Sequence, residues 1–183
     1  MIRHSTYTSE SWKTLPWKKF RCNLFRLQMR IYKAVRAGDR RKAMSLQKLL
    51  LKSSSARLLA IRQVTQLNAG KKTAGVDGKK LLSPKERFEL EDLLKASGNN
   101  WIHGKLRSIP IPKKDGSTRM LKIPTIADRA WQCLAKYAIE PACALHYSTK
   151  RAMVSDQDVR HMMPRNFCST SFARIVTESI NEL

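Results

Sequence analysis

The sequence predicts an α+β domain that is predominantly α-helical, with N-terminal helices, one small antiparallel β-hairpin and a helix after the hairpin. Apolar residues recur every three or four positions through most of residues 18–140, which is the spacing of helices with one buried face. Residues 106–123 alternate instead and contain an Asp-Gly turn signal, which is typical of a hairpin. At 183 residues the chain is long enough to bury one core with a helical appendage.

The first expected helix spans residues 18–37, because its apolar positions form one stripe: Phe20, Leu24, Leu27, Ile31 and Val35. Gly38 and Asp39 supply a stop and a restart. A second helix is expected from residue 41 to about 66, and the serine run at 53–55 predicts that it bends or splits. We expect the two helices to pair as a hairpin, each with a basic face.

Residues 68–82 form the next segment, which holds three glycines and four lysines with little periodicity and therefore predicts a loop. Glycines let a backbone approach a ligand and lysines suit phosphate, but the pattern taken alone favours a plain loop over a binding loop. Ser83 and Glu86 then form a capping box with Pro84 at the first helical position. The helix that they open is expected to end by Gly98.

The hairpin is expected to pair residues 106–111 with residues 119–123 around the Asp115-Gly116 turn, and its prolines indicate an edge strand. A capping pattern at residues 125–128 opens the last helix, residues 126–140, which Pro141 should bend or end. Trp131 and Tyr137 fall in its apolar stripe, so we expect core residues rather than platforms for stacked bases.

The charge is strongly unbalanced, with 36 Lys and Arg against 14 Asp and Glu, a net +22. The first 150 residues carry the whole excess, with 32 basic and ten acidic residues. A polyanion normally neutralises a self-repulsion of this size, so nucleic acid is the natural partner. A ribosomal-type protein or an anionic membrane surface would suit the composition alone.

Metal binding and membrane insertion find little support in the sequence. The four cysteines are far apart, without C-x-x-C spacing, and the four histidines are scattered, so we assign no metal site and expect a reducing compartment. No apolar run approaches membrane-spanning length and no apolar leader follows the start. We expect a non-secreted protein, in a bacterial cytoplasm or in an organelle's stroma or matrix.

Three motifs follow one another in a fixed order. They read Q-x-N-x-G-x-x-T-A-G-V-D-G at residues 66–78, I-P-K-x-D-G at 111–116 and I-P-T-x-x-D-R-x-x-Q at 123–132. Together with the basic helices before them, they resemble the N-terminal extension and first fingers motifs of group II intron reverse transcriptases. The resemblance covers residues 12–147, and an ordered series is far more specific than any single motif.

The resemblance implies a partner, group II intron RNA. In that family the N-terminal helices and the following loop bind the intron's own RNA and hold template, which promotes splicing as a maturase and then reverse transcription. For any single cation a solvated surface charge is the simpler interpretation, and only the density favours RNA. The candidate RNA-binding residues are Arg26, Arg30, Lys33, Arg36, Arg40, Arg41, Lys71, Lys72, Lys79, Lys80 and Arg107.

The resemblance also implies roles in the hairpin. The family places a lysine after I-P, and an arginine six residues later, on the phosphates of the incoming nucleotide, which corresponds to Lys113 and Arg119. Two cations from facing strands can clamp a triphosphate, although an exposed charge or a template contact explains each of them in this chain. Asp128 and Arg129 are interpreted as structural, through capping and local ion pairing.

The polymerase carboxylates are not found in this sequence. The family uses palm aspartates, one on an early strand and two in a Y-A-D-D-type turn, to hold two Mg²⁺ ions, and no such Asp-Asp pair occurs here. We therefore assign no catalytic residue and no cofactor to this chain, and Mg²⁺ is implied only for the complete polymerase. DNA synthesis would require another polypeptide, such as a downstream-encoded palm and thumb.

The organisation that we predict has three parts: a basic helical extension with its loop at 1–82, a fingers-like segment at 83–147, and an atypical tail at 148–183. Where the family continues with Gly-Phe-Arg-Pro-Gly-Arg and then Asp-Ala, the tail departs. Read from the third base of the Met153 codon, the genetic code forces Gly from Met153 and Val154, and Asp-Ala from residues 162–164. We infer a frameshift near Ser148 and expect a disordered tail.

Three functions are compatible with these observations. The leading one is RNA binding by the N-terminal portion of a maturase. The second is one half of a split reverse transcriptase that a palm completes in trans. The third is a non-functional remnant, whose exposed apolar surface would favour aggregation.

Overall fold

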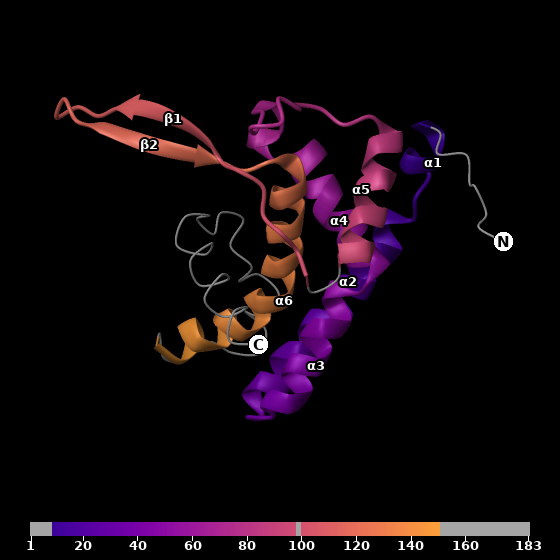
Figure 1. The fold of residues 1–183 in the computed structure, drawn as a ribbon. Helices are drawn as coiled ribbons and strands as arrows, with labels where there is room; N and C mark the ends of the chain where they lie inside the picture. The colour runs from indigo at the N-terminus through magenta and orange to yellow at the C-terminus, as the bar shows by residue number, and fades with distance from the viewer. Residues whose placement is uncertain (1–8, 98–99, 151–183) are drawn as a thin grey trace.

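The computed structural model describes residues 9–97 and 100–150, so nearly all of the atypical tail lies outside the described residues. Helices dominate the described part, and one two-stranded antiparallel sheet projects from it (Figure 1). The predicted α+β class is confirmed. The elements are α1 (Ser9–Lys13), α2 (Trp17–Arg36), α3 (Arg40–Leu51), α4 (Ser54–Arg62), a π-helical turn η1 (Gln63–Leu67), a 3₁₀ turn η2 (Ala69–Lys72), α5 (Pro84–Ser97), β1 (Arg107–Pro112), β2 (Thr118–Ile123) and α6 (Ile126–Lys150).

The first helices follow local signals in the sequence. Gly38 adopts a positive φ of 74° between α2 and α3, a conformation in which glycine costs little. Asp39 then caps α3 by accepting a hydrogen bond from the backbone N–H of Lys42 at 3.0 Å. Ser53 separates α3 from α4, so the predicted split of the second helix is confirmed. The short α1 was not expected, yet its Trp12 is almost fully buried.

The core has two clusters that share α4 and α6. Ile61 and Trp131 belong to the cluster that also contains Trp12 and residues of α5, whereas Leu59 and Leu134 belong to the cluster formed with α2 and α3. Both helices are therefore covered from two sides, and Figure 1 shows α4 between α6 and α5. Trp131 is a core residue, as predicted.

A buried ion pair joins α4 to α5. The guanidinium of Arg57, which is 5% exposed, places Nε and Nη2 each 2.8 Å from Oε1 of Glu91. Its Nη1 donates to the carbonyl of Lys52 at 2.8 Å. Arginine rarely lies in a core unless it is paired, so this side chain fixes α5 against the body of the protein.

The helix α6 continues to Lys150, so the predicted end at residue 140 was wrong. Pro141 has no N–H to donate to the carbonyl of Tyr137, and Nε2 of Gln28 on α2 donates to that carbonyl instead, at 3.1 Å. Nε2 of Gln47 on α3 donates to the next carbonyl, of Ala138, at 3.2 Å. Because these side chains satisfy the carbonyls beside the proline, the helix changes direction there without ending (Figure 1).

The hairpin has the predicted strands and turn, with a register that pairs Arg107 with Ile123 and Pro112 with Thr118. Gly116 adopts a positive φ of 78° in the turn. The N–H of Lys113 donates to the carbonyl of Ser117 at 2.8 Å. That bond fixes the alternation of the ladder, so the backbone N–H positions of residues 108, 110 and 112 face the free edge of β1.

Candidate nucleic-acid interface

The α2–α3 pair is the most basic part of the protein. Residues 17–52 contain twelve Lys and Arg and one acidic residue, Asp39, whose carboxylate caps α3. All twelve basic side chains belong to exposed residues. We call this set the α2–α3 basic surface: Lys18, Lys19, Arg21, Arg26, Arg30, Lys33, Arg36, Arg40, Arg41, Lys42, Lys48 and Lys52.

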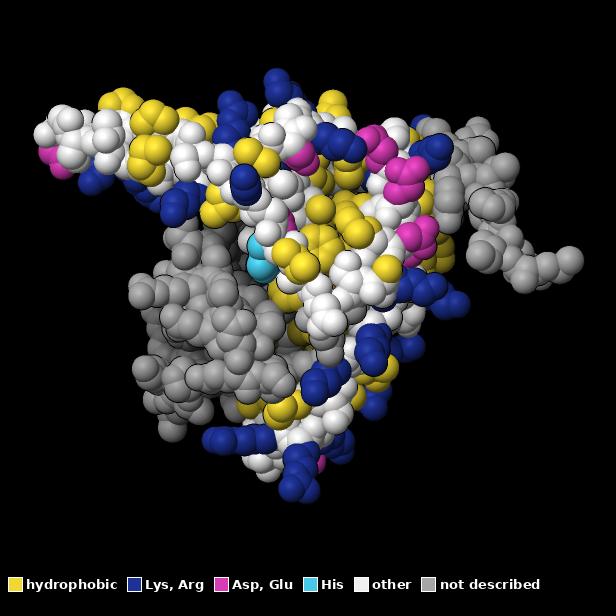
Figure 2. Space-filling view, in the orientation of Figure 1, with side chains coloured by type: hydrophobic (Ala, Val, Ile, Leu, Met, Phe, Trp, Pro, Cys, Tyr) yellow, Lys and Arg dark blue, Asp and Glu magenta, His cyan; other side chains and the backbone are white. Residues whose placement is uncertain are grey.

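Six of the predicted RNA-binding residues lie on this surface. Arg26, Arg30 and Lys33 follow one face of α2 at three- and four-residue spacing, while residues 36, 40 and 41 surround the turn into α3. The other six cations were not singled out from the sequence. Comparing the numbers of basic and acidic residues over 17–52 would have indicated that the whole segment is basic. Figure 2 shows dark blue side chains over the end of the molecule where α3 lies, and magenta carboxylates over α5.

The segment of residues 68–82, here called the lysine loop, carries four of the predicted residues. Nζ of Lys71 donates to the carbonyl of Gln66 at 2.8 Å, so this ammonium is partly used within the fold. Nζ of Lys79 lies 3.2 Å from Oε1 of Glu86. Lys72 and Lys80 are exposed. The loop therefore offers its cations unequally, which the sequence pattern did not indicate.

The start of α6 holds a buried acidic network beside this loop. Asp128, which is 2% exposed, accepts hydrogen bonds from Nε1 of Trp101 at 2.9 Å, the N–H of Gly104 at 3.2 Å and the hydroxyl of Thr125 at 2.8 Å. Nδ1 of His103 lies 3.3 Å from Oδ1 of Asp128, the oxygen that also accepts from Trp101. These contacts tie residues 101–104 to α6, in agreement with the structural interpretation of Asp128.

The hairpin presents the remaining predicted residues. The register places Arg107 and Arg119 on the same face, and continuing it by one residue adds Lys113. All three are exposed, and Nη1 of Arg107 approaches the carbonyl of Ala74 in the lysine loop at 3.5 Å. The nucleotide role of Lys113 and Arg119 stays a prediction.

The predicted cations do not converge on one point. The hairpin projects from one end of the described part and α3 lies at the other (Figure 1). The lysine loop and Arg107 lie together, whereas the α2–α3 basic surface is separate. Such a distribution suits an extended polyanion better than a small ligand.

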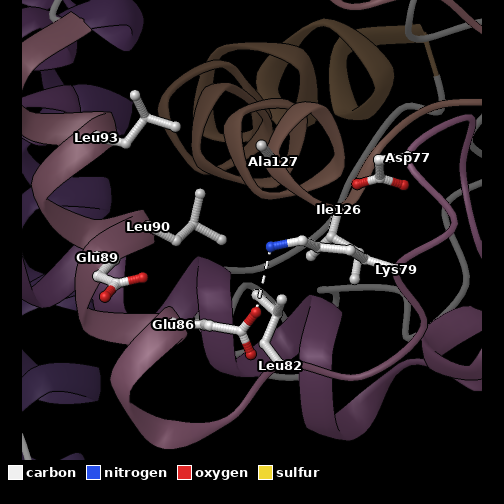
Figure 3. A pocket seen from close by; sticks show the side chains of 9 residues that line it. All are labelled: Asp77, Lys79, Leu82, Glu86, Glu89, Leu90, Leu93, Ile126 and Ala127. Atoms are coloured by element: carbon white, nitrogen blue, oxygen red, sulfur yellow. Dashed lines mark hydrogen bonds and ion pairs between the residues drawn. The ribbon is translucent and has the colours of Figure 1, made fainter.

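An open pocket of about 240 Å³ lies between the lysine loop, α5 and α6. Figure 3 shows Lys79 reaching across it toward Glu86. Hydrogen bonds from Ser83 and Lys79 lower the pKa of Glu86, and Asp77 and Glu89 add further carboxylates to the lining. Three carboxylates against one ammonium make this pocket unsuited to phosphate.

The side chains of the described residues do not gather into a metal site. Within that part of the chain, His, Cys, Asp and Glu side chains form no group of three or more that could hold an ion. We therefore derive no step through Mg²⁺ for these residues. Nor does any helix of the described part have the length and apolar character needed to cross a membrane.

Comparisons with known proteins agree with this arrangement. Residues 12–94, which run from α1 into α5, match the N-terminal domain of reverse transcriptase. Maturase-like protein 1 of Euglena gracilis is 40% identical over 141 residues, or 77% of this chain and 31% of the relative. Maturase-like protein 1 of Euglena longa is 39% identical over 127 residues, or 69% of this chain and 28% of the relative. The chain thus spans less than a third of the length of these relatives, and its residues 12–94 are the part that matches the N-terminal domain of reverse transcriptase.

Proposed function

We propose that this chain is the RNA-binding N-terminal portion of a group II intron reverse transcriptase/maturase, which holds intron RNA and assists its splicing. The observation that carries the proposal is the α2–α3 basic surface, with twelve exposed cations and one acidic residue that is used as a helix cap. Two relatives that are named maturase-like support the same assignment. Mg²⁺ belongs, in this proposal, to the complete polymerase.

The electrostatics favour RNA over a generic acidic partner. Each phosphate that a lysine or arginine neutralises releases counterions, so binding through many cations weakens steeply with salt. Four acidic residues lie on α5, Glu86, Glu89, Glu91 and Asp92, and outnumber the three basic residues of that helix. This separation of charge gives the molecule an oriented field that would steer RNA toward α2 and α3.

The test is salt-dependent binding of the full chain to host intron RNA, compared with an unrelated structured RNA of equal length. Tight binding that prefers the intron at physiological salt would support the proposal. Equal affinity for both RNAs, with the same steep salt slope, would reduce the function to a basic surface. That outcome would favour the remnant interpretation.

Matched variants locate the interface. We expect Arg30→Gln combined with Lys33→Gln to lower the log–log salt slope by about 0.7–0.9 for each lost phosphate contact. Lys85→Gln with Lys95→Gln removes the same charge from the acidic helix α5 and should leave the slope unchanged. An equal decrease of the salt slope in both double variants would show that net charge, and not this surface, governs binding.

A second candidate is one half of a split reverse transcriptase, completed in trans by a palm and thumb polypeptide. Exposed apolar side chains on and before the hairpin favour it, namely Leu106, Ile111 and Met120, which are 40–53% exposed. Co-expression with a downstream reading frame that encodes a palm should then yield a complex with RNA-directed DNA polymerase activity. If the two co-expressed chains do not purify as a complex, that result would argue against the split reverse transcriptase.

A further inference from the structure

Arg129, on the first turn of α6, makes a bridge to the lysine loop. Its Nη1 donates to the carbonyl of Gly70 and its Nη2 to the carbonyl of Thr73, each at 2.9 Å. Nε lies 3.4 Å from the carbonyl of Thr125. The planar guanidinium thus spans two carbonyls that are 56 and 59 residues away in sequence, a geometry that an ammonium cannot reproduce.

The other half of the contact is made by Gly75. A Cβ at this position would lie 2.8 Å from Cα of Thr125 and 2.9 Å from the carbonyl oxygen of Pro124. Both are backbone atoms, so neither can move away as a flexible side chain would. The neighbouring Ala74 is 3% exposed. The middle of the lysine loop is therefore seated directly on the backbone that begins α6.

The charge of Arg129 is compensated within the fold. Burial lowers the pKa of its guanidinium, and the nearby Asp77 opposes that shift. With two carbonyls and a carboxylate of the same loop around it, this arginine faces inward to the loop. It differs in this respect from Lys72 and Lys80, which are exposed on either side of the contact.

We propose that Arg129 and Gly75 are positioning residues that clasp the lysine loop to the start of α6, and so fix where its exposed lysines meet RNA. The clasp itself stands on the contacts above, whereas its effect on RNA rests on the proposed function. Arg129 does not touch RNA in this proposal and acts through the loop.

The clasp is tested first without RNA, by cleavage of the folded full chain with a lysine-specific endoproteinase. We expect Arg129→Gln, Arg129→Lys and Gly75→Ala each to speed cleavage after the loop lysines by about tenfold or more, because the loop opens more often. The matched control is Gly70→Ala, since a Cβ there meets nothing within 4 Å and φ is not positive. It should be cleaved at the parent rate.

The conservative variant separates positioning from charge. If Arg129→Lys protects the loop as well as arginine does, a cation alone suffices and the clasp is overturned. Unchanged cleavage in Gly75→Ala would overturn it too, independently of any loss of fold in the arginine variants. Circular dichroism on each variant identifies global unfolding, which would expose lysines throughout the chain rather than in the loop alone.

The RNA arm is a double-mutant cycle, with Kd for host intron RNA as its readout. Arg129→Gln should weaken binding several-fold in the parent chain, yet have almost no effect when Lys72→Gln and Lys80→Gln are already present. If the losses of RNA affinity from Arg129→Gln and from the two lysine substitutions simply add, Arg129 contacts RNA directly and the positioning role is overturned. If the full chain fails to prefer intron RNA while the cleavage results hold, the proposed function fails and the clasp remains.

Discussion

The buried ion pair between α4 and α5 allows a quantitative test of what holds the helical body together. Arg57→Ala would leave the carboxylate of Glu91, whose side chain is 15% exposed, without its cation, and would remove the donor to the carbonyl of Lys52. Removing one member of a buried pair typically costs about 3–5 kcal/mol. Because small domains are stable by only about 5–15 kcal/mol, we expect a large shift in the urea midpoint.

Two controls make the measurement decisive. Lys85 and Glu89 form an exposed pair at 3.9 Å on α5, and Lys85→Ala should cost at most about 0.5 kcal/mol. Replacing both buried partners, Arg57→Met with Glu91→Leu, should restore stability to within roughly 1–2 kcal/mol of the parent chain, since no uncompensated charge remains. If Arg57→Ala alone lowers the free energy of unfolding by less than about 1 kcal/mol, the reasoning is refuted.

Three further predictions concern side chains with defined surroundings. Gln28→Ala should cost about 1–3 kcal/mol in thermal unfolding, because it leaves the carbonyl of Tyr137 without its donor; an unchanged Tm would mean that water replaces the amide. Ser83→Ala should lower the free energy of unfolding by about 1 kcal/mol at pH 7. Because the pKa of Glu86 is lowered in the folded protein, the part of this loss that comes from the Glu86 carboxylate is present above pH 4.5 and disappears as the pH falls through the folded pKa. Burial raises the pKa of the Cys133 thiol from 9.0 to about 11, so this thiol should resist Ellman's reagent at pH 8. The stability that the protein gains by keeping the thiol neutral should be lost as the pH rises from about 9 through 11. Rapid labelling of Cys133 in the native protein, located by mass spectrometry, would contradict this.

Local chemistry made much of the fold predictable. The Ser83–Glu86 capping box forms with both of its hydrogen bonds, from the N–H of Ser83 and from the N–H of Glu86. The Gly38 turn, the split at Ser53 and the hairpin register each follow from signals within a few residues of sequence. Such features depend on short-range hydrogen bonds and backbone preferences, which can be predicted from residues that are close together in the sequence.

The features that could not be predicted depend on partners distant in sequence. Pro141 favours a helix end locally, but Gln28 and Gln47, each about ninety or more residues earlier, satisfy the carbonyls beside it, and α6 continues. Arg57 has the composition of a surface residue until α5 supplies Glu91. In the candidate site, ten of the eleven cations that charge density singled out are exposed, and their contact with RNA stays a prediction. Which lysines are bonded within the fold, such as Lys71, and what holds their loop, namely Arg129, became evident only from the geometry.

Within the described residues the projecting hairpin has two unpaired edges, and a ribbon of that kind would ordinarily be a template for other chains. Along β1 the outward backbone positions are residues 108, 110 and 112, and two of these are Pro110 and Pro112, which have no N–H to offer. The outward positions of β2 retain their donors and include Lys122. Stacking into extended sheets needs both edges to accept a neighbour, so at most one strand can add to this ribbon, along β2.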